Sequence, residues 1–162
     1  MSESNVKKEV IEKIQKWLKE ESIDFIKIEE PYLDFRFDIK NPNQTILSFT
    51  DKPDSVLFVT HVSLTLEDKK AFAALENNEE KFKILWDLER SLIEINVGYV
   101  LLPNHKNLDK VEISKKIYFD ALTKDKFMDI IFALQRGLYL VELMLRQLGG
   151  KYYSNSTTTF IL

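Results

Sequence analysis

Two different periods organise the apolar residues in the first forty positions. Between Val6 and Leu18 apolar residues recur every three or four positions with Lys and Glu between them, which predicts an amphipathic helix. Residues 33–39 alternate strictly between apolar and polar side chains, which predicts a strand with one buried and one wet face. Residues 24–28 predict a shorter strand, and Pro31 separates the two.

Turn-forming residues divide the next segment into two further strands. Residues 41–43 and 51–54 each combine proline with asparagine or aspartate, a composition typical of tight turns. Residues 45–50 and 55–63 are rich in β-branched and aromatic side chains, which favour strands. Because the connections are short, we expect these strands to form an antiparallel meander.

A helical period returns after the fourth predicted strand. Thr65 and Asp68 have the spacing of a capping box, so a helix is expected to begin near residue 66. Asn77-Asn78 marks a point where this helix breaks or kinks. Residues 82–95 then carry a wide apolar stripe at helical spacing.

Two more strands and a capped helix complete the pattern. Residues 97–102 and 111–119 are predicted to be strands. Thr123 is the expected N-cap of a last helix that ends at Gly149-Gly150. The pattern therefore predicts an α+β fold, an antiparallel sheet of about five to six strands with three main helices in the order α-β-β-β-β-α-β-β-α.

The last predicted helix is apolar over most of its circumference. One stripe suits the core and consists of Phe127, Ile131, Leu134, Leu138, Val141, Leu145 and Leu148. A second stripe consists of Met128, Phe132, Tyr139 and Leu143. Because one sheet covers only one stripe of a helix, we expect the second to be covered by another helix or by a subunit interface.

Length and composition indicate a folded protein with its own core. The 162 residues are 44% hydrophobic and 30% charged, far from the signature of disorder. We expect one α+β domain over residues 1–150 and a weakly ordered tail over residues 151–162, where Ser, Thr and Asn dominate. The amino terminus lacks the apolar core of a signal peptide, so a cytoplasmic location is the expectation. Four charged residues interrupt the most apolar stretch, residues 127–148, which argues against a membrane span.

The chain lacks the residues that several kinds of functional site require. It has no cysteine, which excludes disulfides and thiolate metal sites, and its four glycines form no phosphate-binding loop. A net charge of -3 argues against non-specific nucleic-acid binding. We therefore expect no cofactor, no metal site and no nucleophilic elbow.

Two histidines and a pair of lysines leave two alternative functions open. His61 lies mid-strand and has no ligand partner at helical spacing, and His105 has only Asp109 at i+4, in a loop where that spacing puts nothing on one face. A catalytic or small-ligand site assembled in space around His61 is one alternative to a binding module. Lys115-Lys116 beside Tyr118 is the basis of the other, a nucleic-acid accessory role, although lysines protecting an edge strand explain the pair more simply.

The run from Ile113 to Met128, ISKKIYFDALTKDKFM, resembles an uncharacterised, mainly archaeal domain family of unknown function. That resemblance, in outline over residues 1–150, implies the fold of type III secretion chaperones and sensory-transduction regulators, with helices on a strongly bent antiparallel sheet. Relatives of known role in that fold are homodimers that hold extended client segments without nucleotide or metal. The run itself marks no chemistry, because it is a strand leading into a capped helix.

These observations favour a non-enzymatic, chaperone-like or protein-binding module that forms a homodimer and engages a protein or peptide client. Aromatic side chains are the anchors that interfaces prefer. The predicted interface is the second stripe, Met128, Phe132, Tyr139 and Leu143, with Trp86 as an auxiliary anchor. On this hypothesis Phe132→Asp breaks self-association and leaves the monomer folded.

Overall fold

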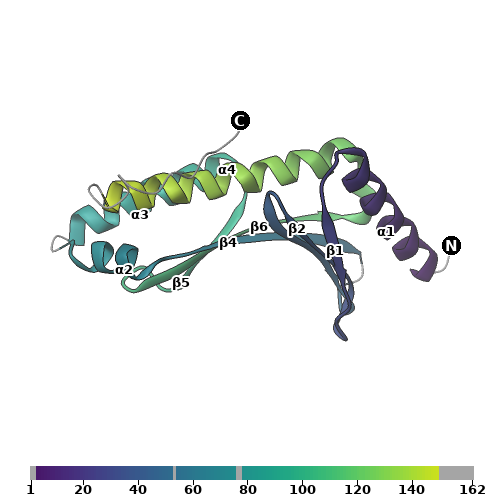
Figure 1. Cartoon of the computed structure of the whole chain (residues 1–162), viewed down its shortest axis with the longest axis horizontal. Helices are drawn as coiled ribbons and strands as arrows, with labels where there is room; N and C mark the ends of the chain where they lie inside the picture. The colour runs from purple at the N-terminus through teal and green to yellow at the C-terminus, as the bar shows by residue number, and fades with distance from the viewer. Residues whose placement is uncertain (1–2, 53, 76–77, 150–162) are drawn as a thin grey trace.

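The computed structural model describes residues 3–52, 54–75 and 78–149, which build one six-stranded antiparallel sheet with the long helices on one side (Figure 1). The strands are β1 (Phe25–Ile28), β2 (Leu33–Lys40), β3 (Asn43–Phe49), β4 (Ser55–Ser63), β5 (Gly98–Pro103) and β6 (Leu108–Tyr118). Their order in the sheet is β1-β2-β3-β4-β6-β5, so the first four form the expected meander. β5 lies at one edge and β1 at the other.

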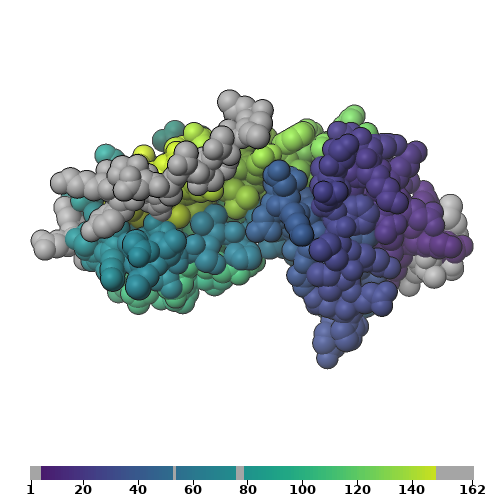
Figure 2. All heavy atoms as spheres, in the orientation of Figure 1, coloured from purple at the N-terminus to yellow at the C-terminus, as the bar shows by residue number. Residues whose placement is uncertain are grey.

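Four helices and one short 3-10 turn accompany the sheet. They are α1 (Glu3–Glu20), α2 (Leu66–Ala73), α3 (Asn78–Glu94), η1 (Phe119–Ala121) and α4 (Lys124–Gly149). Figures 1 and 2 show α1 and the first strands at one end of the molecule and α2, α3 and β5 at the other. Of the helices in the described residues, none is both long and apolar enough to cross a membrane.

The α+β fold class and the element order are confirmed, with two local differences. The single helix expected after Thr65 is two helices, α2, which ends at Ala73, and α3, which begins at Asn78. The expected break at Asn77-Asn78 falls partly outside the described residues. The Thr65–Asp68 capping box is formed, with each side chain accepting from the other residue's backbone N–H. Phe119 was wrongly predicted to extend a strand. It begins η1, where its N–H donates to Asp54 O at 2.8 Å.

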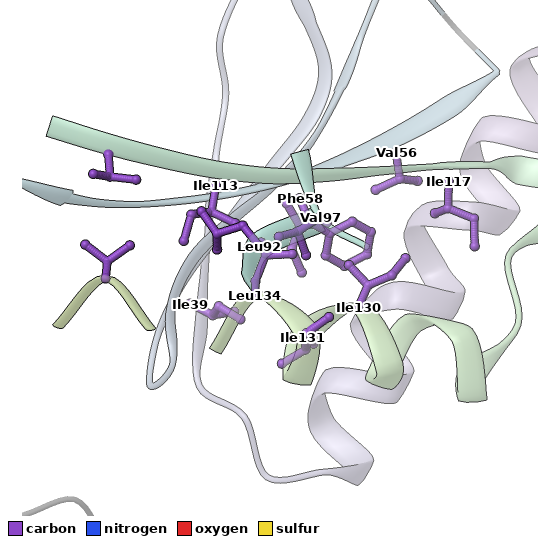
Figure 3. Close-up of a cluster of buried hydrophobic side chains, with 14 of the residues drawn as sticks. Ile39, Val56, Phe58, Leu92, Val97, Ile113, Ile117, Ile130, Ile131 and Leu134 are labelled. Atoms are coloured by element: carbon purple, nitrogen blue, oxygen red, sulfur yellow. The ribbon is translucent and has the colours of Figure 1, made fainter. Parts of the chain in front are cut away.

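Helix α4 lies across the sheet and supplies the largest share of the core on the helical side. Five of the seven residues of its first stripe are buried as predicted, and Leu138 and Leu148 are half-buried. Figure 3 shows Ile131 and Leu134 pointing at side chains from the sheet and α3. Phe127, fully buried, contacts the rings of Trp17 in α1 and Phe58 in β4 at centroid distances of 5.4 and 5.5 Å. One helix thus joins α1, α3 and the central strands.

Gly137 lies where α4 comes closest to its neighbours. A Cβ on this residue would be 3.0 Å from Ile113 Cδ1 in β6 and 3.5 Å from Leu92 Cδ2 in α3. Glycine inside a helix costs up to about 1 kcal/mol relative to alanine. The close approach of three elements accounts for its presence here.

A buried glutamine also joins the sheet to α4. Gln44 of β3 is 2% exposed, and its Nε2 donates to the carbonyl oxygen of Ile131 at 2.9 Å. The carbonyl of Ile131 lies in the interior of α4, where each carbonyl oxygen already accepts a hydrogen bond from the N–H four residues later. The bond from Gln44 is therefore an additional one. It fixes α4 over the meander, 87 residues away in the chain.

Gly137→Leu is expected to lower the free energy of unfolding by about 3 kcal/mol, because four extra carbons must displace buried Ile113 and Leu92. Gly137→Ala is the matched control. Its gain in helix propensity offsets the tight contact, so its effect should stay within about 1 kcal/mol. Urea unfolding followed by circular dichroism measures both, and equal losses for the two variants would contradict the close approach.

Candidate functional site

The two aromatic residues of the second stripe of α4 face away from the core, whereas Met128 packs against it. Phe132 is 52% exposed and Tyr139 is 49% exposed, whereas Met128 and Leu143 are half-buried. The four residues are separated by four, seven and four positions, so they lie on one face of the helix. Two large aromatic side chains therefore stand on the outer surface of the helical layer.

Polar residues surround this outer face of α4, which we define by Met128, Phe132, Tyr139 and Leu143. Gln135 and Arg136 lie between the two aromatic residues and are exposed. Glu142, half-buried one turn beyond, has a raised carboxyl pKa because burial disfavours its charge, and Arg146 partly opposes that shift. The outer face of α4 therefore combines two exposed aromatic rings with polar side chains between and beside them, a mixture that protein interfaces also contain.

Trp86, expected beside the α4 stripe, instead belongs to a second apolar surface on α3. Trp86 is 57% exposed and stacks on Phe82, with ring centroids 6.4 Å apart and an interplanar angle of 12°. Ile93, two turns further along α3, is 63% exposed. Phe82, Trp86 and Ile93 form what we call the outer face of α3.

Glu89 shows which way the outer face of α3 points. Trp86 and Ile93 lie three positions before and four positions after Glu89, so all three occupy one side of the helix. Glu89 accepts a hydrogen bond from Tyr99 in β5, and its Oε1 is 3.0 Å from His105 Nε2 in the loop after β5. The apolar side of α3 therefore overhangs the β5 edge of the sheet.

This Glu89 contact also alters the titration of Tyr99. Burial raises the pKa of the Tyr99 phenol, and the charge and hydrogen bond of Glu89 raise it further. His105 was expected to be a free loop residue and is exposed, but it is paired. Sixteen residues separate it from Glu89, so no local spacing could have indicated this cluster.

His61 is exposed on the face of the sheet opposite the helices. Its neighbour across the ladder is Glu112 of β6, whose carboxylate contacts Lys110 Nζ at 3.3 Å. Within the described ranges 3–52, 54–75 and 78–149, no group of three or more His, Cys, Asp or Glu residues is arranged to hold a metal. In the described part of the chain, His61 therefore has one acidic neighbour, Glu112, and not the cluster of acidic groups that the catalytic hypothesis requires.

Lys115 and Lys116 do not form one patch. They are adjacent in β6, so their side chains point to opposite faces of the sheet. Lys116 instead contacts Tyr118, with Nζ donating to the phenol oxygen at 3.0 Å. The β5 ladder ends at Ser114, so the part of β6 that carries both lysines is paired by β4 on one side and not by β5 on the other. This local edge agrees with the interpretation of the pair as protection of an edge strand.

A charged network on the open face of the sheet was missed by sequence reasoning. Arg36 donates two hydrogen bonds to the Asp38 carboxylate, at 2.8 and 2.9 Å, and also contacts Glu30. Thr45 Oγ1 donates to Asp38 at 3.0 Å. These bonds, chiefly those from Arg36, lower the pKa of Asp38. The i, i+2 spacing of Arg36 and Asp38 on a strand is the signal that could have identified them.

Comparison with known proteins places the fold without assigning a role. A family model described as "Uncharacterized conserved protein (DUF2299)" matches residues 10–145. An uncharacterized protein from Methanothermobacter thermautotrophicus has a similar structure, with TM-score 0.77 and 23% identity over 86% of this chain and 99% of that one. YbjN, a putative transcription regulator from E. coli, matches with TM-score 0.43 and 12% identity over 85% and 89% of the two chains, too weakly to support an argument. No curated protein matches the sequence.

Exchanging Phe132 for Asp is expected to change the free energy of unfolding by no more than about 0.5 kcal/mol, because the side chain is half exposed on a helix surface. Phe127→Ala, on the buried face of the same helix, should cost about 3 to 5 kcal/mol. Chemical denaturation of both variants checks the assignment of the two faces. A large loss in Phe132→Asp would mean that this residue is part of the core.

Tyr99 is expected to make the protein lose stability at alkaline pH. The pKa of the Tyr99 phenol is raised in the folded state, so the folded protein holds this proton more tightly than the unfolded chain. The resulting contribution to the free energy of unfolding is present below the unfolded pKa of about 10 and disappears as pH rises through the folded value. Tyr99→Phe should flatten this decline, and Glu89→Gln should leave an intermediate slope because burial remains. Urea midpoints measured across the alkaline range test this, and identical slopes in all three proteins would exclude the effect.

Proposed function

Because the chain belongs to the family described as Uncharacterized conserved protein (DUF2299), whose description names no activity, we propose its function from its surfaces: it is a non-enzymatic, homodimeric protein-binding module. The observation that carries the proposal is the outer face of α4, where Phe132 and Tyr139 are about half exposed. Burying an aromatic side chain of this size in a partner is among the strongest contributions to binding.

The shape of the outer face of α4 suggests what kind of partner it binds. From Met128 to Leu143 the face is about 23 Å long, at 1.5 Å per residue, and one row of side chains wide. A narrow ridge on a helix packs well against one amphipathic helix, whose side chains fill the spaces between those of α4. We therefore assign an amphipathic helix of a client protein as the occupant.

Rigidity supports the same assignment. The opposite side of α4 is held by the buried contacts of Phe127, Gly137 and Gln44, so the outer face is presented by a fixed element. A surface that is ordered before binding loses little conformational entropy when a partner docks. The rival enzymatic hypothesis around His61 has no comparable support, since the acidic neighbour of His61 is paired with a lysine.

Binding of amphipathic peptides tests the proposal directly. We expect a fluorescent helical peptide with apolar residues at i, i+3, i+4 and i+7 to bind the full chain, and a scrambled peptide of equal composition to bind at least tenfold more weakly. Phe132→Asp and Tyr139→Asp should each weaken binding by about tenfold or more, because a charge replaces a buried ring. Fluorescence anisotropy measures all of these affinities.

Lys126→Asp is the control, because it places a carboxylate at an exposed position of α4 outside the outer face. It should bind like the unmodified protein. The proposal fails if ordered and scrambled peptides bind equally, or if Phe132→Asp and Lys126→Asp have the same effect.

A further inference from the structure

The two edges of the sheet differ in how they are protected from pairing. β1 carries Lys27 at its centre, and Asp24, Glu29 and Glu30 flank it. Charged side chains of this kind are the usual protection of an edge strand. β5 has the sequence GYVLLP and contains no charged residue. In the described residues β5 pairs with β6 on one side and with no strand on the other.

The uncharged β5 edge, which is interrupted only at its end by Pro103, lies beneath exposed aromatic surface. The outer face of α3, formed by Phe82, Trp86 and Ile93, is on the side of the helix that Glu89 ties to Tyr99 of β5. Val100 of β5 is also 49% exposed, on the opposite side of the sheet. Figure 1 shows α3 and β5 at the same end of the molecule. This end therefore combines unpaired backbone with exposed apolar side chains on both sides of the sheet.

We propose that β5 and the outer face of α3 form the interface of a homodimer, in which two copies of β5 pair antiparallel and the two α3 helices pack together. Antiparallel pairing of identical strands creates a two-fold axis perpendicular to the sheet. That axis keeps the helices of both copies on the same side. The outer face of α3 then meets its own copy, which is the self-complementarity that a two-fold interface requires.

A second copy fits this surface better than an unrelated strand does. A lone peptide strand would satisfy the backbone of β5 but would leave Trp86 and Phe82 in water, since they lie on the helical layer. A second copy supplies a strand in the sheet layer and an apolar helix face in the helical layer, so it covers both parts of the surface. β5 itself carries no charged side chain, so pairing two copies of this strand brings no like charges together along the strand.

The size of the surface predicts a modest affinity. α3 has 17 residues and is about 26 Å long, and the height from β5 to the top of α3 is roughly 20 Å. The footprint is then about 500 Å² per copy, or about 1,000 Å² in total, at the lower end for specific interfaces. We therefore expect the dimer to dissociate on dilution. The outer face of α4 points elsewhere and stays open to a client.

Light scattering across a dilution series of the full chain tests the interface. The unmodified protein should change from dimer to monomer, whereas Trp86→Asp and Ile93→Asp should be monomeric throughout. Far-UV circular dichroism of the two variants should match that of the diluted protein, because both positions are exposed in the monomer. Phe132→Asp should retain the dimer. A protein that is monomeric at every concentration, or a dimer abolished by Phe132→Asp and kept by Trp86→Asp, would overturn the proposal.

Crosslinking tests the strand pairing independently. The chain has no cysteine, so Val100→Cys introduces a single thiol at the β5 edge. A short bifunctional maleimide should link two Val100→Cys chains at concentrations where the dimer forms. Lys27→Cys, on the opposite edge of the sheet, is the matched control and should not crosslink. Efficient linkage of Lys27→Cys with none for Val100→Cys would place the interface at β1 and contradict the assignment.

Discussion

The packing of one long helix across the sheet is the constraint on which the rest of the structure depends. α4 contacts the central strands, α3 and α1, and at Gly137 its backbone comes so close that a single methyl group would touch Ile113. Protein interiors transmit such changes because they are packed at high density. Any shift of α4 would therefore alter the position of α3 over β5.

A helix held this closely on one side presents its other side as a fixed surface. The apolar side chains left over after the core is filled gather on the outer faces of α3 and α4, and they point in different directions because Trp86 lies on the side of α3 that faces the β5 edge. Two separate surfaces permit two separate contacts. One suits a second copy of the chain, and the other suits a helix of a client.

Much of the local structure could be predicted because its causes are local. The strand over residues 55–63, the capping box at Thr65 and the two stripes of the last helix all follow from period and turn chemistry. Strand order could not be predicted, since it depends on the pairing of β6, rather than β5, with the distant β4.

The candidate site was harder to predict than the fold. The spacing of apolar residues alone identifies Phe132 and Tyr139 as more apolar surface than the core can cover. It cannot show which way Trp86 points, because neighbouring elements decide which part of the wide apolar stripe of α3 is covered. The contact of Glu89 with Tyr99 and His105, which orients α3, depends entirely on the tertiary fold.

The fluorescence of Trp86 tests most directly whether the surplus apolar surface is an interface. In a Trp17→Phe variant, which keeps an aromatic ring against Phe127, Trp86 is the only remaining tryptophan. We predict emission at shorter wavelength in concentrated protein and a shift to that of a solvent-exposed indole on dilution. Emission typical of an exposed indole at every concentration would contradict the account.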